Sequence, residues 1–213
     1  PSSVPIDVHS GQARPHASFA ASLALKRILD VLIAATLLVL LLPVLLVLAI
    51  AIKLDSPGPV FFRQRRRGRS FEPFQMWKFR SMKHNAPDPA ARYETVATDA
   101  RITRVGHFIR RTSLDELPQL FNVMGGTMSL VGPRPLVDWE SEEAVKTHQD
   151  RFLLPPGITG LSQVEVRNGA PFAQRLDKDV EYVRRHSLWL DLSILLRTPA
   201  RVVQADMIYP EAK

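Results

Sequence analysis

An uncharged apolar segment at residues 31–52 sets the strongest limit on how this chain can fold. Leucine, valine, isoleucine and alanine dominate it, and a straight helix of this length would be roughly 33 Å long, enough to cross a hydrocarbon core of about 30 Å. Pro43 lies near its middle, where proline lacks an N–H to donate and its ring clashes with the preceding turn. We therefore expect a helix kinked at Pro43, with arms of about 18 Å and about 14 Å that are each too short to span.

Basic residues on both sides of the segment favour a re-entrant helix. Lys26 and Arg27 precede it, and Lys53 and the arginines of residues 63–69 follow it. Excess positive charge stays on the cytoplasmic side, so both ends prefer the same side of the membrane. A kinked helix that spans completely is the alternative, because membrane helices tolerate proline, and the residues alone weigh the two about equally. Asp30 is interpreted as an interfacial or helix N-terminal carboxylate, favoured by the helix dipole.

The composition narrows the classes of site. The chain has 213 residues, enough for one compact unit plus an extra segment, with a formal net charge of +7 and no cysteine. The charge favours an anionic partner, whether nucleic acid, phospholipid headgroups or a phosphorylated substrate. The missing cysteines exclude disulfides, thiolate zinc sites and a cysteine nucleophile. The arginines of residues 63–69 adjoin the apolar segment, so we expect them to contact lipid headgroups and not nucleic acid.

The remaining patterns predict a mainly α fold with a little β (α+β). Residues 188–196 are nearly all apolar, and they fit either a helix on the membrane surface anchored by Trp189 or a buried helix. Strands are expected at 60–62 and 74–79, helices at 101–111, 113–124 and 139–148, and a last apolar pattern at 176–196, ending before Pro199.

Two adjacent carboxylates, Asp115 and Glu116, are the candidate catalytic groups. They follow two arginines and lie at the expected start of a helix, where a carboxylate can hold Mg²⁺ together with phosphate oxygens or attack phosphorus. The pattern Ser113-x-x-Glu116 is also a capping box, in which both acids serve only the helix end. Judged on local sequence, capping is the more frequent of the two.

Arg134 is the candidate phosphate ligand. It stands between Pro133 and Pro135, which hold the backbone extended and stiff on both sides. A guanidinium presented in this way suits a bidentate grip on phosphate. An ordinary surface turn with a salt bridge is the alternative.

Several blocks together resemble one family, the monotopic phosphoglycosyl transferases, also called bacterial sugar transferases. The resemblance runs from about Lys26 to the C-terminus, and several blocks in order are more specific than any one alone. The blocks are Lys26-Arg27-Ile28-Leu29-Asp30, Pro43, Lys78-Phe79-Arg80-Ser81-Met82, Ser113-Leu114-Asp115-Glu116-Leu117-Pro118-Gln119-Leu120, Met128-Ser129-Leu130-Val131-Gly132-Pro133-Arg134-Pro135 and Pro156-Gly157-Ile158-Thr159-Gly160.

The resemblance implies a membrane enzyme with a covalent mechanism. It implies transfer of a sugar-1-phosphate from a UDP-sugar to undecaprenyl phosphate with Mg²⁺, at the cytoplasmic face of the bacterial inner membrane and among its phospholipids. The expected layout is a flexible lead-in at 1–25, a re-entrant helix at 26–54 and a catalytic domain with interfacial helices at 55–213. The oligomeric state is not readable from the sequence, so a homodimer stays open.

The resemblance also assigns roles to residues. Asp115 matches the nucleophile that forms a phosphosugar-aspartyl intermediate and also a metal ligand, and Glu116 matches a base or metal partner. The matching substrate ligands are Arg134, Lys78, Arg80, Arg167 and Asp179. A neutral hexose is favoured over an N-acetylated amino sugar. The alternative function is a noncatalytic membrane-attached protein that binds anionic lipid or nucleic acid through its arginines.

Overall fold

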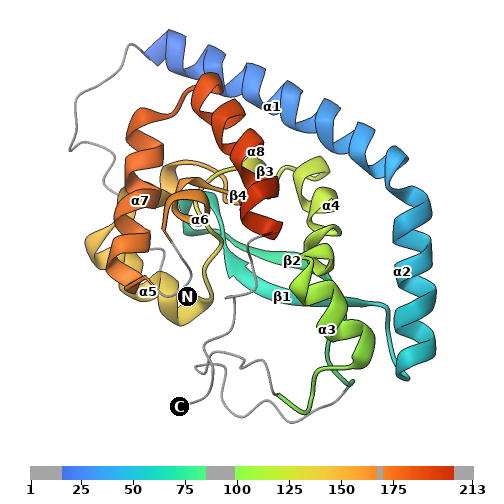
Figure 1. Cartoon of the computed structure of the whole chain (residues 1–213). Helices are drawn as coiled ribbons and strands as arrows, with labels where there is room; N and C mark the ends of the chain where they lie inside the picture. The colour runs from blue at the N-terminus through green and yellow to red at the C-terminus, as the bar shows by residue number, and fades with distance from the viewer. Residues whose placement is uncertain (1–15, 85–98, 167–169, 204–213) are drawn as a thin grey trace.

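The computed structural model describes residues 16–84, 99–166 and 170–203, and within them the chain is mainly helical with two small sheets (Figure 1). This confirms the expected α+β class. The helices are α1 (His16–Leu40), α2 (Leu42–Asp55), α3 (Arg104–Arg111), α4 (Gln119–Met124), α5 (Asp138–Thr147), α6 (Leu161–Glu165), α7 (Phe172–Arg185) and α8 (Leu188–Val203). The strands are β1 (Phe61–Arg67), β2 (Pro73–Phe79), β3 (Ser129–Val131) and β4 (Gly157–Thr159), and short 3-10 turns are η1 (Arg69–Phe71), η2 (Leu114–Glu116) and η3 (Gln149–Leu153).

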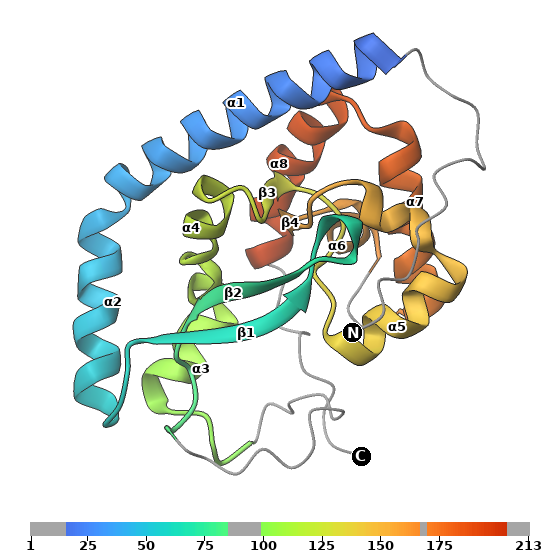
Figure 2. The ribbon, with the colours of Figure 1, turned by 180° about the vertical axis from the view of Figure 1, so that it is seen from behind.

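The apolar segment forms a bent helix pair along one edge of the molecule (Figures 1 and 2). The axes of α1 and α2 differ by 62°, and no single described helix is both long and apolar enough to cross a membrane, whereas this bent pair passes the same test of length and composition. The break falls at Leu41, and Pro43 lies in the first turn of α2. The predicted bend is confirmed, but it comes just before the proline, because proline is tolerated in the first turn of a helix, where its missing N–H needs no partner.

Buried polar contacts dock α1 on the rest of the molecule. The Nζ of Lys26 lies 2.7 Å from Asp191 Oδ2 of α8, and Asp30 accepts hydrogen bonds from the Oγ of Ser129 and the backbone N–H of Leu130 in β3. The interpretation of Asp30 as an interfacial or N-terminal carboxylate is therefore wrong. Asp30 is 6% exposed in the middle of α1, where burial is tolerated because its charge is paired and hydrogen-bonded.

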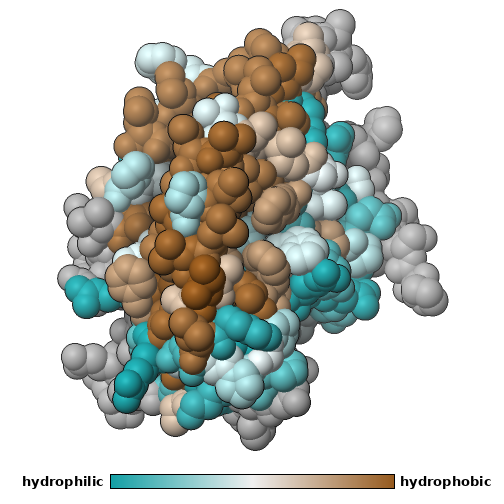
Figure 3. All heavy atoms as spheres, turned by 90° about the vertical axis from the view of Figure 1, so that its right-hand side faces the viewer, coloured by the Kyte–Doolittle hydropathy of each residue, from teal (hydrophilic) through white to brown (hydrophobic). Residues whose placement is uncertain are grey.

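The opposite face of the bent pair is an exposed apolar band, seen in brown in Figure 3. Large apolar side chains on it are strongly exposed, including Leu32 at 59%, Val39 at 72% and Val47 at 65%. A contiguous apolar surface of this kind is rare on a monomeric soluble protein and marks an interaction with a membrane or another protein.

The β1–β2 hairpin carries the basic run. The strands pair antiparallel over their full lengths, so β1 extends well beyond the expected strand at 60–62, while β2 confirms the expected strand at 74–79. Alternate residues of a strand point to opposite faces. Phe74 and Met76 face the core, and Lys78 continues on their side of the hairpin.

Glycines allow a close approach between the parallel pair β3–β4 and the loop that follows β3. A Cβ on Gly132 would lie 2.4 Å from the carbonyl oxygen of Pro155, and one on Gly160 would lie 2.2 Å from that of Gly132. Only glycine fits such contacts. The close packing fixes the Pro133-Arg134-Pro135 segment beside residues 157–160.

The last apolar pattern forms two helices and not one. The chain turns between α7 and α8, and α8 continues through Pro199, so the expected end before that proline is wrong. Ile194 of α8 is fully buried, whereas Trp189 is 78% exposed and Leu196 is 72% exposed. One face of α8 is therefore core, and the other adds to the exposed apolar surface.

Candidate active site

The two adjacent carboxylates lie in η2, the tight turn between α3 and α4. Ser113, just before it, has a left-handed backbone with φ of 55° and makes no capping hydrogen bond with its side chain. The capping box is therefore not formed, and the helix expected at 113–124 is replaced by η2 and the short helix α4. Freed from a capping role, both acids turn to the end of β2.

Lys78 joins the two acids. Its Nζ lies 2.7 Å from Glu116 Oε1 and 3.9 Å from Asp115 Oδ2. The lysine comes from β2 and the acids come from η2, so the hairpin and the turn meet at this ion pair. The side chain of Glu116 is 27% exposed and that of Asp115 only 12%.

The two acids differ in proton affinity. Burial raises the pKa of Asp115 to about 6, and the neighbouring Glu116 charge adds to the rise, while Lys78 and Arg110 oppose it. Burial also disfavours the charge of Glu116, but Lys78 and Arg134 outweigh it, so the pKa of Glu116 falls below its ordinary value. Two neighbouring carboxylates with pKa values shifted in opposite directions are typical of active sites in which the two acids have different catalytic roles.

A polar pocket of about 270 Å³ opens beside the dyad. Glu116 lies in its wall, and Asp115 adjoins it through the shared contact with Lys78. Cations from three different elements or loops converge on it. The polar side chains in the wall are Arg66, Lys78, Glu116, Gln119, Arg134 and Gln163.

Arg66 was missed by the sequence reasoning, which assigned its whole run to lipid headgroups. Its side chain is 16% exposed, and its Nε is buried without a hydrogen-bond partner among the described residues. Burial and the like charge of Arg134 lower its pKa to about 10, against the opposing pull of Glu140. The signal that could have found it is the period of two in β1, which turns Arg66 inward while Arg63 and Arg65 are exposed on the other face.

A buried hydrogen-bonded group of Arg151, Asp179 and Ser162, called the strut below, holds the backbone of Arg134. The Nη2 of Arg151 donates to the carbonyl oxygen of Arg134 and, at 2.7 Å, to Asp179 Oδ2. Ser162 donates to the other oxygen of Asp179 at 2.7 Å. Asp179 is 2% exposed, so it lies in this strut and not in the pocket wall.

The other expected substrate ligands fall outside the pocket. Arg80 is 5% exposed, and its guanidinium donates to the carbonyl oxygens of Ile52, Ser56 and Pro57 at the end of α2. These contacts give it a structural role, which does not support the prediction that it binds substrate. Arg167 lies outside the described residues.

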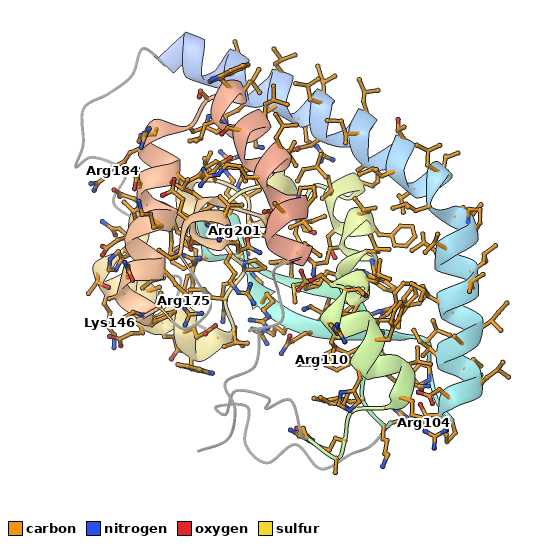
Figure 4. All side chains as sticks on the ribbon, viewed as in Figure 1. Arg104, Arg110, Lys146, Arg175, Arg184 and Arg201 are labelled. Atoms are coloured by element: carbon orange, nitrogen blue, oxygen red, sulfur yellow. The ribbon has the colours of Figure 1, made fainter. Side chains whose placement is uncertain are left out.

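Arg110 is a further cation near the dyad and is not part of the pocket wall. It stands near the C-terminal end of α3, beside the turn that carries the two acids (Figure 4). Its positive charge lowers the pKa of Asp115 in part. The charges of Lys78, Arg110 and Arg134 therefore all act on the dyad, as expected where a phosphate is bound.

The donor set fits a divalent cation that is shared with a substrate. Mg²⁺ usually keeps several waters and binds one or two carboxylates together with phosphate oxygens. Asp115 and Glu116 supply carboxylate oxygens beside the pocket that Arg66, Lys78 and Arg134 line. Among the residues that the structure describes, no group of three or more His, Cys, Asp or Glu side chains gathers in a way that could hold a metal ion.

Comparison with known proteins identifies the family of the chain. A family described as "Bacterial sugar transferase" matches residues 21–205. A Caulobacter vibrioides protein named UDP-glucose:undecaprenyl-phosphate glucose-1-phosphate transferase is 45% identical over 195 residues, covering 86% of this chain and 72% of that protein. A Xanthomonas campestris pv. campestris protein of the same name is 43% identical over 192 residues, or 86% of this chain.

The relatives differ in length. The chain spans only 40% of the Xanthomonas protein. By contrast, it spans 94% of the "Exopolysaccharide production protein PSS" of Rhizobium leguminosarum bv. phaseoli, to which it is 41% identical over 187 residues, or 83% of this chain. The family match covers the bent helix pair, the dyad and the pocket alike. The chain belongs to the bacterial sugar transferase family.

Proposed function

We propose that the protein transfers a hexose-1-phosphate from a UDP-hexose to undecaprenyl phosphate and releases UMP. The observation that carries the proposal is the Asp115–Glu116 pair, held by Lys78 beside a pocket that Arg66 and Arg134 also line. The names of the Caulobacter and Xanthomonas relatives support this reaction class and favour glucose as the sugar. The name of the Rhizobium relative supports a place in exopolysaccharide assembly.

In the first step, a carboxylate oxygen of Asp115 attacks the phosphorus that carries the sugar. The new bond from that oxygen to phosphorus forms as the bond to the bridging oxygen breaks, and UMP leaves with the bridging oxygen. The product is a phosphosugar-aspartyl anhydride. In the second step, a phosphate oxygen of the polyprenol phosphate attacks the same phosphorus, and the Asp115 carboxylate leaves unchanged.

The surrounding residues stabilise charge and position. Arg134, on its stiff backbone, and Arg66, with its free Nε–H, donate to the non-bridging phosphate oxygens. Lys78 keeps both acids in place and favours the ionised nucleophile. Asp115 and Glu116 would hold Mg²⁺, which neutralises phosphate charge when it is bound.

We further propose that the bent helix pair enters and leaves the same leaflet and that the protein lies at the cytoplasmic face of the inner membrane, where the basic residues on both sides of the pair would be retained. The 62° bend and the exposed apolar band of α1 and α2 support this arrangement (Figure 3). The exposed Trp189 and Leu196 of α8 extend the same surface and suit an interfacial anchor. A site held at headgroup height can meet the phosphate of the lipid carrier.

The reaction is tested with purified protein, undecaprenyl phosphate, Mg²⁺ and a panel of UDP-sugars, with UMP release as the readout. We expect UMP release with UDP-glucose or UDP-galactose, and loss of it in Asp115→Asn. Binding to anionic vesicles or nucleic acid without UMP release for any sugar would favour the noncatalytic alternative.

The topology is tested by labelling from one side, because the chain has no cysteine of its own. Ala21→Cys and Leu54→Cys place single thiols at exposed positions near the two ends of the pair. A re-entrant pair exposes both to a membrane-impermeant thiol reagent on the cytoplasmic side. Labelling of only one of them from that side would indicate a spanning helix.

A further inference from the structure

Gln163 presents a free hydrogen-bond acceptor at the wall of the pocket. It belongs to α6 and lines the same pocket as Glu116 and Lys78. Its Nε2 donates to the carbonyl oxygen of Ile158 at 3.1 Å, and this contact fixes which way the amide faces. The Oε1 atom is buried and has no hydrogen-bond partner among the described residues.

Such an atom needs a hydrogen-bond donor from water or from a bound ligand, because buried polar atoms in folded proteins almost always have a partner. The helix that carries Gln163 cannot easily turn to bring the oxygen to water. Arg201 reaches from α8 to the carbonyl oxygen of Val164 at 2.8 Å, and its label in Figure 4 lies where α8 meets α6. The neighbouring Gly160 packs on Gly132 through backbone atoms, which fixes the start of α6.

The chemistry of the free atom selects its partner. An amide oxygen only accepts, so it needs a donor, and an ionised phosphate has none. The pocket borders the Asp115–Glu116 dyad, so the parts of the substrate that reach it first are those bonded most directly to the reacting phosphorus. The hexose is bonded through one oxygen to that phosphorus, whereas the uracil ring lies beyond a second phosphate and a ribose.

We propose that Gln163 Oε1 accepts a hydrogen bond from a hydroxyl group of the transferred hexose and so takes part in the choice of sugar. The inference rests on the proposed function, since it takes the hexose of a UDP-hexose as the ligand. Gln163 is then a specificity residue, and the cations of the same pocket hold the phosphate.

The test compares Gln163→Met, which keeps the side-chain length and removes the acceptor, with the unchanged protein. Each is assayed with UDP-glucose and with UDP-glucose analogues that lack one hydroxyl each. We expect Gln163→Met to lower kcat/KM for UDP-glucose about tenfold and to leave inhibition by UMP within about twofold. For one deoxy analogue, the two proteins should be equally active, because the lost hydroxyl and the lost acceptor are partners.

The matched control is Glu165→Gln on the same helix, whose side chain lies outside the pocket wall and pairs with Lys178 at 2.8 Å and Arg197 at 3.5 Å. Glu165→Gln should change neither kcat/KM for UDP-glucose nor inhibition by UMP. If Gln163→Met does not fold, Gln163→Asn retains the amide but withdraws the oxygen and serves for the same comparison.

Two results would overturn the inference. One is an equal loss with every deoxy analogue, and the other is weaker inhibition by UMP, which would make Gln163 a nucleotide or packing residue. If none of the UDP-sugars led to UMP release by the unchanged protein, the proposed function itself would fail. That failure would be seen before any Gln163 variant is made.

Discussion

Asp115→Asn should make the protein more stable while it abolishes turnover. Asp115 is buried, and its pKa is raised from 3.8 to about 6, chiefly by burial. A carboxyl group with its pKa raised to about 6 ionises in the folded state at a cost of roughly 3 kcal/mol relative to the unfolded chain. Asparagine has nearly the same shape and no charge, so we expect the free energy of unfolding to rise by about 2–3 kcal/mol at pH 8.

The gain depends on pH with a definite sign. Between about pH 4 and pH 6 the folded protein retains the proton of Asp115 and the unfolded chain has lost it, so stability falls as pH rises through this window. Above about pH 6 the whole penalty is present, and below about pH 4 it is absent. The advantage of Asp115→Asn should therefore be greatest at pH 8 and should disappear near pH 4.

The assay is thermal unfolding of the detergent-solubilised protein across this pH range. For a chain of this size, 2–3 kcal/mol corresponds to a rise in Tm of roughly 4–12 °C. Glu116→Gln is the matched control with the opposite sign, because Lys78 and Arg134 lower the pKa of Glu116, and its charge therefore stabilises the fold. A Tm for Asp115→Asn below that of the unchanged protein at pH 8, or a difference that does not vary with pH, would refute the reasoning.

Three further predictions concern the residues around the dyad. The kcat/KM of the unchanged protein should decrease at pH values below about 6, as Asp115 becomes protonated. Lys78→Met should lower kcat/KM and move this decrease to higher pH, because Lys78 favours the ionised form of Asp115. A pH profile that does not move in Lys78→Met would contradict the electrostatic role of Lys78. Arg80→Met should lower the free energy of unfolding by several kcal/mol, because it strands buried carbonyl oxygens at the end of α2, and it should leave the KM for the UDP-sugar unchanged; a raised KM in folded protein would restore Arg80 as a substrate ligand. Gly160→Ala should lower the yield of folded protein, since its Cβ would lie 2.2 Å from the carbonyl oxygen of Gly132, and an unchanged Tm would show that the two loops can separate.

The sequence predicts the local features of the fold well. A proline within a long apolar run indicates a bend on steric grounds. The mixture of aromatic and basic residues at 74–79 indicates the strand that carries Lys78. Both depend on residues near in the chain. The break at Leu41 and the passage of α8 through Pro199 differ from expectation because a proline limits the backbone without fixing where a helix ends.

Contacts between residues far apart in the chain determine the roles of several charged side chains, and local sequence patterns do not predict such contacts. Asp30 pairs with Ser129, and Glu116 pairs with Lys78, so neither acid serves a helix end as its local pattern indicates. Arg80 follows Lys78 by two positions, but β2 ends at Phe79, and Arg80 turns to the end of α2.

Covalent capture of the sugar phosphate tests the central claim most directly. The protein is incubated with UDP-glucose labelled in the sugar and with Mg²⁺, without undecaprenyl phosphate, and is then digested and analysed by mass spectrometry. We predict that a hexose phosphate is attached to the peptide containing Asp115, that it is released when undecaprenyl phosphate is added, and that Asp115→Asn acquires no label. Turnover by a protein that never carries the label, or label retained in Asp115→Asn, would contradict the account.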